Sequence, residues 1–144
     1  MKTIICTISG AGASAIALLF GGWNQALATL LLFMVIDYIS GLVVAGVFKR
    51  SNKTKSGALE SKAGFKGLCR KSMVLVFVLI AARLDMLLHM TYIRDAVVIG
   101  FAVNELLSIM ENAGLMGIPL PKALSEAVDI LQSGNLHGKT AKKS

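Results

Sequence analysis

Five polar residues lie inside long apolar runs of the sequence, where few neighbouring groups can solvate or pair with their side chains. Asp37, Arg83, Asp85 and Glu105 can carry charge, and Asn104 can hydrogen-bond. A charge at the centre of a membrane helix costs about 2.5–3.5 kcal/mol on insertion scales. These groups should therefore face one another, another subunit or water, and we interpret all five as candidate pore-lining or intramembrane polar residues.

Small residues recur at intervals of four beside two of these polar groups. In a helix this spacing places the side chains on one face. A face of small residues lets a second helix approach closely in lipid. Four residues are therefore predicted to serve in helix packing: Gly41 and Ala45, in line with Asp37, and Gly100 and Ser108, in line with Asn104.

The charges within the apolar runs do not balance, since three acids accompany the single base Arg83. Arg83 and Asp85 are two residues apart and point to nearly opposite sides of a helix. One acid can pair with Arg83, and the other two must be protonated, hydrated or paired in a neighbouring subunit. Two interpretations remain open: the groups hold a stable bundle together, or they line water in an oligomer.

No residues have the types and spacing of a catalytic centre. The two histidines, His89 and His137, lack the spacing of metal ligands, and there is no nucleophile motif. Residues 10–15 fit the dinucleotide pattern G-x-G-x-x-A, but that motif needs a strand and an amphipathic helix on a sheet. Residues 13–28 carry no charge and no sheet pattern follows. We predict a protein that is not an enzyme, with no catalytic, cofactor-binding or metal-binding residue.

The composition indicates that much of the chain lies in a lipid membrane. Hydrophobic residues make up 55% of the 144 residues and charged residues 16%, against roughly 25% charged in soluble domains. We predict an all-α integral membrane protein with a single membrane domain over 1–134. Its spans should cover about 4–22, 26–48, 72–90 and 93–110, although a count of three stays open. Cleavage of a signal peptide after residue 28 is the alternative for the first run.

The net charge of +7 lies in one segment, residues 49–71, which holds eight bases against the single acid Glu60. A basic loop between apolar runs faces the cytoplasm, so both termini should also be cytoplasmic. Basic clusters beside a membrane bind anionic lipid head groups. The nucleic-acid alternative is weak because Phe65 is the one aromatic residue available for stacking. The predicted lipid-facing residues are Lys49, Arg50, Lys53, Lys55, Lys62, Lys66, Arg70 and Lys71.

Two further segments have helical patterns. From Ser61, basic residues recur every four positions, which predicts an interfacial helix leading into the third span; a solvated linker is the alternative. After Pro119 and Pro121, apolar residues at helical spacing predict a short amphipathic helix over 121–133. Gly134 should end it, and residues 135–144 are predicted to form a basic flexible tail.

Several of these motifs together resemble a known family. They are the run 37–41 (Asp-Tyr-Ile-Ser-Gly), the Leu84-Asp85 pair, the run from Asn104 to Asn112, and residues 117–121 (Gly-Ile-Pro-Leu-Pro). Over residues 30–131 the chain resembles the phage holins that include the toxin-secretion holins of clostridia.

The resemblance implies a function. Holins accumulate in the cytoplasmic membrane of the host, oligomerise into lesions at a set time and let an endolysin reach the cell wall, while toxin-secretion relatives release a toxin. The expected partners are other copies of this chain, membrane lipids and an endolysin that is not stably bound, with no nucleic acid and no cofactor. Two alternatives remain, an antiholin-like regulatory membrane partner and a small ion channel or transporter subunit.

Overall fold

The computed structural model describes the backbone of residues 1–140 and contains helices but no strands over that range. The elements are α1 (Lys2–Leu19), α2 (Gln25–Val43), the π-helical turn η1 (Val44–Phe48), α3 (Ser61–Leu88), α4 (Ile93–Leu115) and α5 (Lys122–Thr140). The all-α prediction is confirmed.

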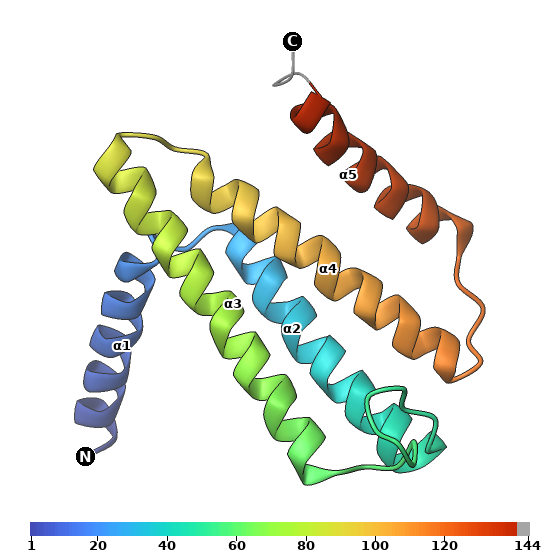
Figure 1. Ribbon diagram of the computed structural model, residues 1–144. Coiled ribbons are helices and arrows are strands. Elements are labelled where there is room, and N and C mark those ends of the chain that lie inside the picture. The colour runs from blue at the N-terminus through green and yellow to red at the C-terminus, as the bar shows by residue number, and fades with distance from the viewer. Residues whose placement is uncertain (141–144) are drawn as a thin grey trace.

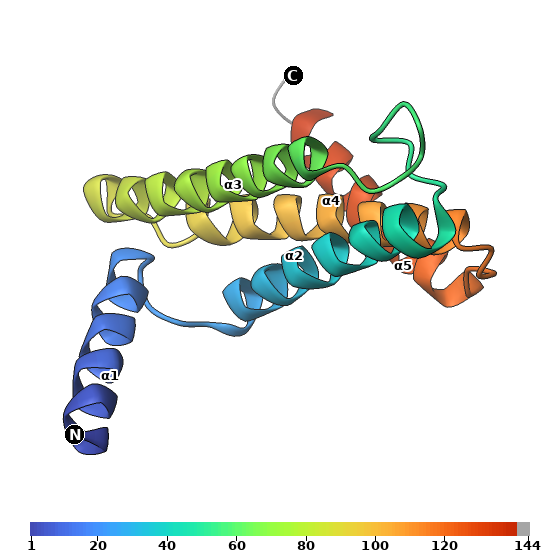
Figure 2. The same ribbon diagram turned by 90° about the horizontal axis from the view of Figure 1, so that it is seen from below.

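Helices α2, α3 and α4 form a three-helix bundle, with α4 packed most extensively against α2 (Figure 1). Helix α1 diverges from this bundle, contacts mainly α3 and buries none of its residues (Figure 2). Helix α5 folds back beside α4 (Figure 1). The packed unit of the chain is thus formed by the middle three helices.

Helices α2, α3 and α4 alternate in direction, so the connections gather at two ends of the bundle (Figure 1). At one end, Arg94 Nη1 donates hydrogen bonds to the carbonyl oxygens of Phe20 (2.7 Å) and Gly22 (2.9 Å). These bonds tie the α1–α2 turn to the start of α4. At the other end, Asn52 Nδ2 in the basic loop donates to Glu111 Oε1 (2.6 Å) near the end of α4. The basic loop and the two short turns therefore lie at opposite ends of the bundle.

Local interactions set where the helices begin and end. The Asn24 side chain accepts a hydrogen bond from Leu27 N (2.9 Å), which caps α2. Helix α3 ends where His89 takes a left-handed conformation (φ 52°). The first residue of helix α3 is Ser61. The residue before it, Glu60, makes no capping hydrogen bond with its side chain.

The buried apolar core is small and formed by Leu27, Leu30, Met34, Val78 and Val98. The outer surfaces of the helices carry many large apolar side chains, for example Leu32, Ile39 and Leu87, which are more than half exposed. Soluble monomers rarely expose contiguous apolar patches of more than a few hundred Å². The exterior therefore suits lipid better than water.

Within residues 1–140, two helical segments are long and apolar enough to cross a membrane, Lys2–Leu19 and Gln25–Phe48, with mean hydropathies of 1.5 and 2.3. The predicted count of four spans is not confirmed and stays a prediction. Helix α3 has 28 residues and extends about 42 Å at 1.5 Å per residue, which exceeds the hydrocarbon thickness of about 30 Å. The interfacial helix and the third apolar run predicted from the sequence are one continuous helix.

The C-terminal helix is longer than predicted. It continues past Gly134 to Thr140, so it includes part of the segment predicted as a flexible tail. The rest of that tail, residues 141–144, lies outside the described residues.

Candidate functional site: an ion cluster between three helices

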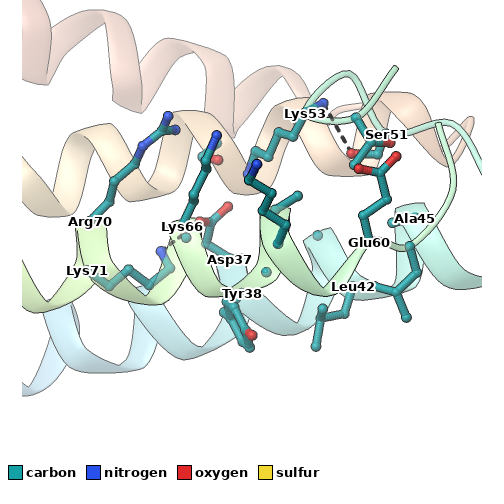
Figure 3. A pocket seen from close by; sticks show the side chains of 18 of the residues that line it. Asp37, Tyr38, Leu42, Ala45, Ser51, Lys53, Glu60, Lys66, Arg70 and Lys71 are labelled. Atoms are coloured by element: carbon teal, nitrogen blue, oxygen red, sulfur yellow. Dashed lines mark hydrogen bonds and ion pairs between the residues drawn. The ribbon is translucent and has the colours of Figure 1, made fainter. Parts of the chain in front are cut away.

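Three charged side chains from three helices meet inside the bundle. The Nζ atom of Lys71 on α3 lies 2.7 Å from Oδ2 of Asp37 on α2 and 2.5 Å from Oε2 of Glu105 on α4. Figure 3 shows the Lys71 side chain reaching to Asp37 across the gap between α3 and α2. The side chains of both acids are 7% exposed and that of Lys71 is 15% exposed. We call Asp37, Lys71 and Glu105 the ion cluster.

Asn112, near the end of α4, completes the polar interior. Its Nδ2 atom donates hydrogen bonds to Asp37 Oδ1 (3.1 Å), Ser40 Oγ (2.8 Å) and the carbonyl oxygen of Asp37 (3.3 Å). Among the described residues, no buried side-chain nitrogen or oxygen lacks a hydrogen-bond partner. The buried polar groups of a single chain thus satisfy one another, as the low dielectric of the interior demands.

The ion cluster contains two carboxyl groups for one ammonium group. Taking charges out of water costs several kcal/mol per ion, and this cost is recovered only by close pairing and further hydrogen bonds. Lys71 contacts both acids and Asn112 adds a donor to Asp37. Loss of Lys71 would leave two buried acids without a cation, so the bundle depends on this one side chain.

The close approach of α2 and α4 at the cluster uses the predicted small-residue face. Ala45 is buried, and a Cβ atom at Gly41 would lie 3.8 Å from Asn112 Nδ2. A Cβ atom at Gly100 would meet no heavy atom of another described element within 4 Å, so there is room at this position for a second helix. Ser108 lines a cavity that is also lined by Asp37 and Glu105. Contacts of these residues between copies stay a prediction.

Lys71, not Arg83, is the base that pairs with the acids. Arg83 is exposed, and its Nη1 atom lies 3.4 Å from Met86 Sδ. The sequence pattern predicts Lys71 as a lipid-facing residue of the basic loop, but α3 begins at Ser61, ten residues earlier, and turns Lys71 inward. A signal in the sequence was available, since Lys71 lies three and seven positions before Val74 and Val78 on one helical face.

Asp85 caps a helix within the single chain, and its predicted role as an intramembrane or pore-lining residue stays a prediction. Its carboxylate accepts hydrogen bonds from the backbone N–H groups of Ile93 (3.0 Å) and Arg94 (2.9 Å), which are free donors in the first turn of α4. It is therefore a capping residue at the α3–α4 turn rather than a member of the ion cluster. Asn104 is exposed and lines the cavity, so of the five predicted polar residues only Asp37 and Glu105 belong to the cluster.

Asn112 and Arg94 were missed by the sequence analysis. Asn112 lies two residues beyond the fourth predicted span, whereas α4 continues to Leu115 and buries this side chain. Arg94 is the second residue of the fourth predicted span, and nothing in its spacing indicates that it binds carbonyl groups 72 and 74 residues away.

Comparison with known proteins decides the family. The model of the bacteriophage holin family matches residues 14–133. This chain belongs to the bacteriophage holin family. A probable holin of Bacillus phage phi105 is 29% identical over 120 residues, which cover 83% of this holin and 82% of the relative. The membership and the apolar helices identify a transmembrane protein of phage lysis.

Bacterial relatives of this holin are also found. An uncharacterized protein of Halalkalibacterium halodurans is 41% identical over 126 residues, or 83% of this chain and 87% of the relative. An uncharacterized 14.9 kDa protein of Clostridium perfringens is 34% identical over 117 residues, or 80% and 83%. No solved structure matches this holin.

Proposed function

We propose that this holin oligomerises in the bacterial cytoplasmic membrane and opens lesions through which an endolysin, or in some hosts a toxin, leaves the cytoplasm. The observation that carries the proposal is the ion cluster, which is buried in a bundle with an apolar exterior. A membrane protein that holds charges inside and apolar groups outside can line a hole only by rearranging its helices.

The proposed mechanism starts from the satisfied single bundle. Lys71 pairs with both Asp37 and Glu105 while the protein accumulates, so neither acid faces lipid. Assembly through the face of Gly41 and Ala45 then separates α2 from α4 and turns the charged side chains toward water. Hydration replaces the pairing that is lost, because a charge in water needs no partner. Asn104, already exposed beside the cluster, would join the lining.

The proposed orientation is multi-pass, with both termini and the basic loop in the cytoplasm. It is supported by the concentration of the net charge in residues 49–71 and by the placement of that loop at the end opposite the two short turns. The exposed residues Cys6 and Cys69 then both lie on the cytoplasmic side.

Cysteine labelling tests this orientation. In a Cys6→Ser variant, a membrane-impermeant maleimide should label Cys69 in inverted vesicles but not in intact spheroplasts. The reciprocal variant Cys69→Ser reports the N-terminal helix in the same way. Labelling of Cys69 from outside would contradict the proposed orientation.

Expression of the protein alone in bacteria tests the function. Membrane potential and release of a cytoplasmic enzyme are followed after induction. Sudden loss of potential with release of protein-sized cargo is expected, and ion leakage alone would instead favour a small channel subunit.

The self-contained ion cluster favours a second candidate, an antiholin-like regulator. A chain whose buried polar groups are all satisfied internally could remain monomeric and inhibit a lesion-forming partner by binding it. Cells that stay energised when they contain the inserted protein alone, yet lyse later when a known holin is co-expressed, would support the regulator over the lesion former.

A further inference from the structure

A cavity of about 380 Å³ opens at the basic end of the bundle, between α2, α3 and the loop that joins them. The ion cluster forms its floor, and basic side chains surround its mouth (Figure 3). The proposed lesion mechanism does not use this cavity.

Four basic residues besides Lys71 line the cavity. Lys62, Lys66 and Arg70 follow one another at intervals of four along a single face of α3, and Lys53 reaches the same space from the loop (Figure 3). All four are exposed, and among the described residues none forms an ion pair. They place four positive charges at the mouth, and no acid within the described part of the chain forms an ion pair with them.

Three acids also line the cavity, and their positions restrict where an anion can lie. Asp37 and Glu105 are both bound to Lys71 at the floor. Glu60 lies at the loop side and accepts a hydrogen bond from Ser56 Oγ (3.2 Å). An anion is therefore repelled from the floor and attracted to the mouth, where Lys62, Lys66 and Arg70 lie.

Two glycines on α3 help to keep the cavity open. Gly64 and Gly67 lie opposite Tyr38 of α2, and Cβ atoms placed there would be 3.5 Å from its Oη atom and 3.8 Å from its Cε2 atom. All three residues line the cavity. Larger side chains on this face would occupy the space between the two helices.

The geometry points to a phosphate-binding site at the mouth of this cavity, formed by Lys53, Lys62, Lys66 and Arg70, which takes the headgroup of an anionic phospholipid. Basic cavities between membrane helices on the cytoplasmic side suit such headgroups, and Arg and Lys are the side chains that pair best with phosphate oxygens. The assignment to the inner leaflet rests on the proposed orientation; the phosphate site itself does not. Free phosphate is the other source of the same chemistry.

The chain supplies its own matched control. Lys49, Arg50 and Lys55 belong to the same basic loop but do not line the cavity. A triple variant K49Q/R50Q/K55Q removes three charges, as does K62Q/K66Q/R70Q. If the attraction to anionic lipid is diffuse, both triple variants should lose the same affinity. If the lipid binds at the proposed site, only K62Q/K66Q/R70Q should lose affinity.

The test is native mass spectrometry of the full-length protein in a nonionic detergent, where no charged membrane surface exists. The protein is titrated with phosphatidylglycerol, with phosphatidylcholine and with inorganic pyrophosphate. Wild type and K49Q/R50Q/K55Q should retain phosphatidylglycerol, while K62Q/K66Q/R70Q should bind it roughly 100-fold more weakly, at about fivefold per basic residue. Circular dichroism checks that both variants remain helical, and K62R/K66R/R70K should restore binding.

Three outcomes would overturn the proposal. Equal losses in the two triple variants would show a diffuse electrostatic effect, and equal retention of phosphatidylcholine would show that the headgroup charge is not recognised. Binding of pyrophosphate without retention of phosphatidylglycerol would make free phosphate the ligand and reject the lipid. None of these results depends on lesion formation, so the site and the proposed function fail separately.

Discussion

Lys71 Nζ lies 2.5 Å from Oε2 of Glu105, which joins the basic segment of α3 to the middle of α4. The same ammonium group also contacts Asp37 on α2. One lysine therefore links the three helices that form the bundle, and this relationship has consequences that can be measured.

Replacement of Lys71 by Met should destabilise the bundle by about 3–5 kcal/mol, because it leaves two buried acids without their cation. The measurement is chemical unfolding in detergent micelles, followed by helicity. Lys66→Met is the control, since Lys66 lies on the same helix but is exposed and unpaired among the described residues. Equal stability of the two variants would contradict the role of the ion cluster.

Asn112→Leu should destabilise the protein by about 1–3 kcal/mol, since it removes a donor from the buried Asp37 carboxylate and from Ser40. Asn104→Leu removes the same amide from an exposed position of α4 and should be nearly neutral. Unfolding of the two variants side by side checks this difference. If Asn104→Leu lowered the free energy of unfolding more than Asn112→Leu, the buried amide of α4 would have been assigned to the wrong residue.

Asp37→Leu or Glu105→Leu should change the onset of lysis or abolish it, because each removes a charge that the proposed lesion exposes to water. The measurement is the time at which membrane potential collapses after induction, with membrane levels of the protein held equal. Asp129→Asn, in the exposed part of α5, serves as the control. Unchanged timing in both single variants and in the double variant would count against a lining role.

Arg94→Gln should loosen α1, because it removes the guanidinium that binds the carbonyl oxygens of Phe20 and Gly22. Hydrogen exchange should accelerate in the turn over residues 20–24 and in α1, while the exchange of α2 should change little. Arg83→Gln is a matched control, since Arg83 is exposed. Identical exchange in both variants would mean that other contacts hold the turn.

Hydropathy was sufficient to predict an all-helical membrane protein, since a helix lies over each of the four apolar runs. The pairing inside the bundle was harder to predict. Arg83 was the predicted partner because it lies inside an apolar run, as the acids do, whereas the base that pairs with Asp37 and Glu105 lies 34 residues from each. Such a contact depends on how the helices pack and not on local spacing.

The role of Asp85 shows a second limit. A short turn over residues 89–92 brings the end of α3 beside the start of α4, whose first N–H groups need acceptors. The sequence shows an acid within an apolar run, which suggests an intramembrane charge. The Asp85 carboxylate caps α4 because the turn brings the start of α4 beside it, and the direction of this turn is not visible in the sequence.

Helix α1 shares no buried residue with the rest of the protein. Its apolar surface meets the requirements of lipid on all sides, and Arg94 anchors the turn that follows it. Entry into the bilayer and association with the other helices are thus separate events for this segment. In the proposed topology, the first helix can insert as soon as it is synthesised, whereas the ion cluster can form only after α2, α3 and α4 have all been made.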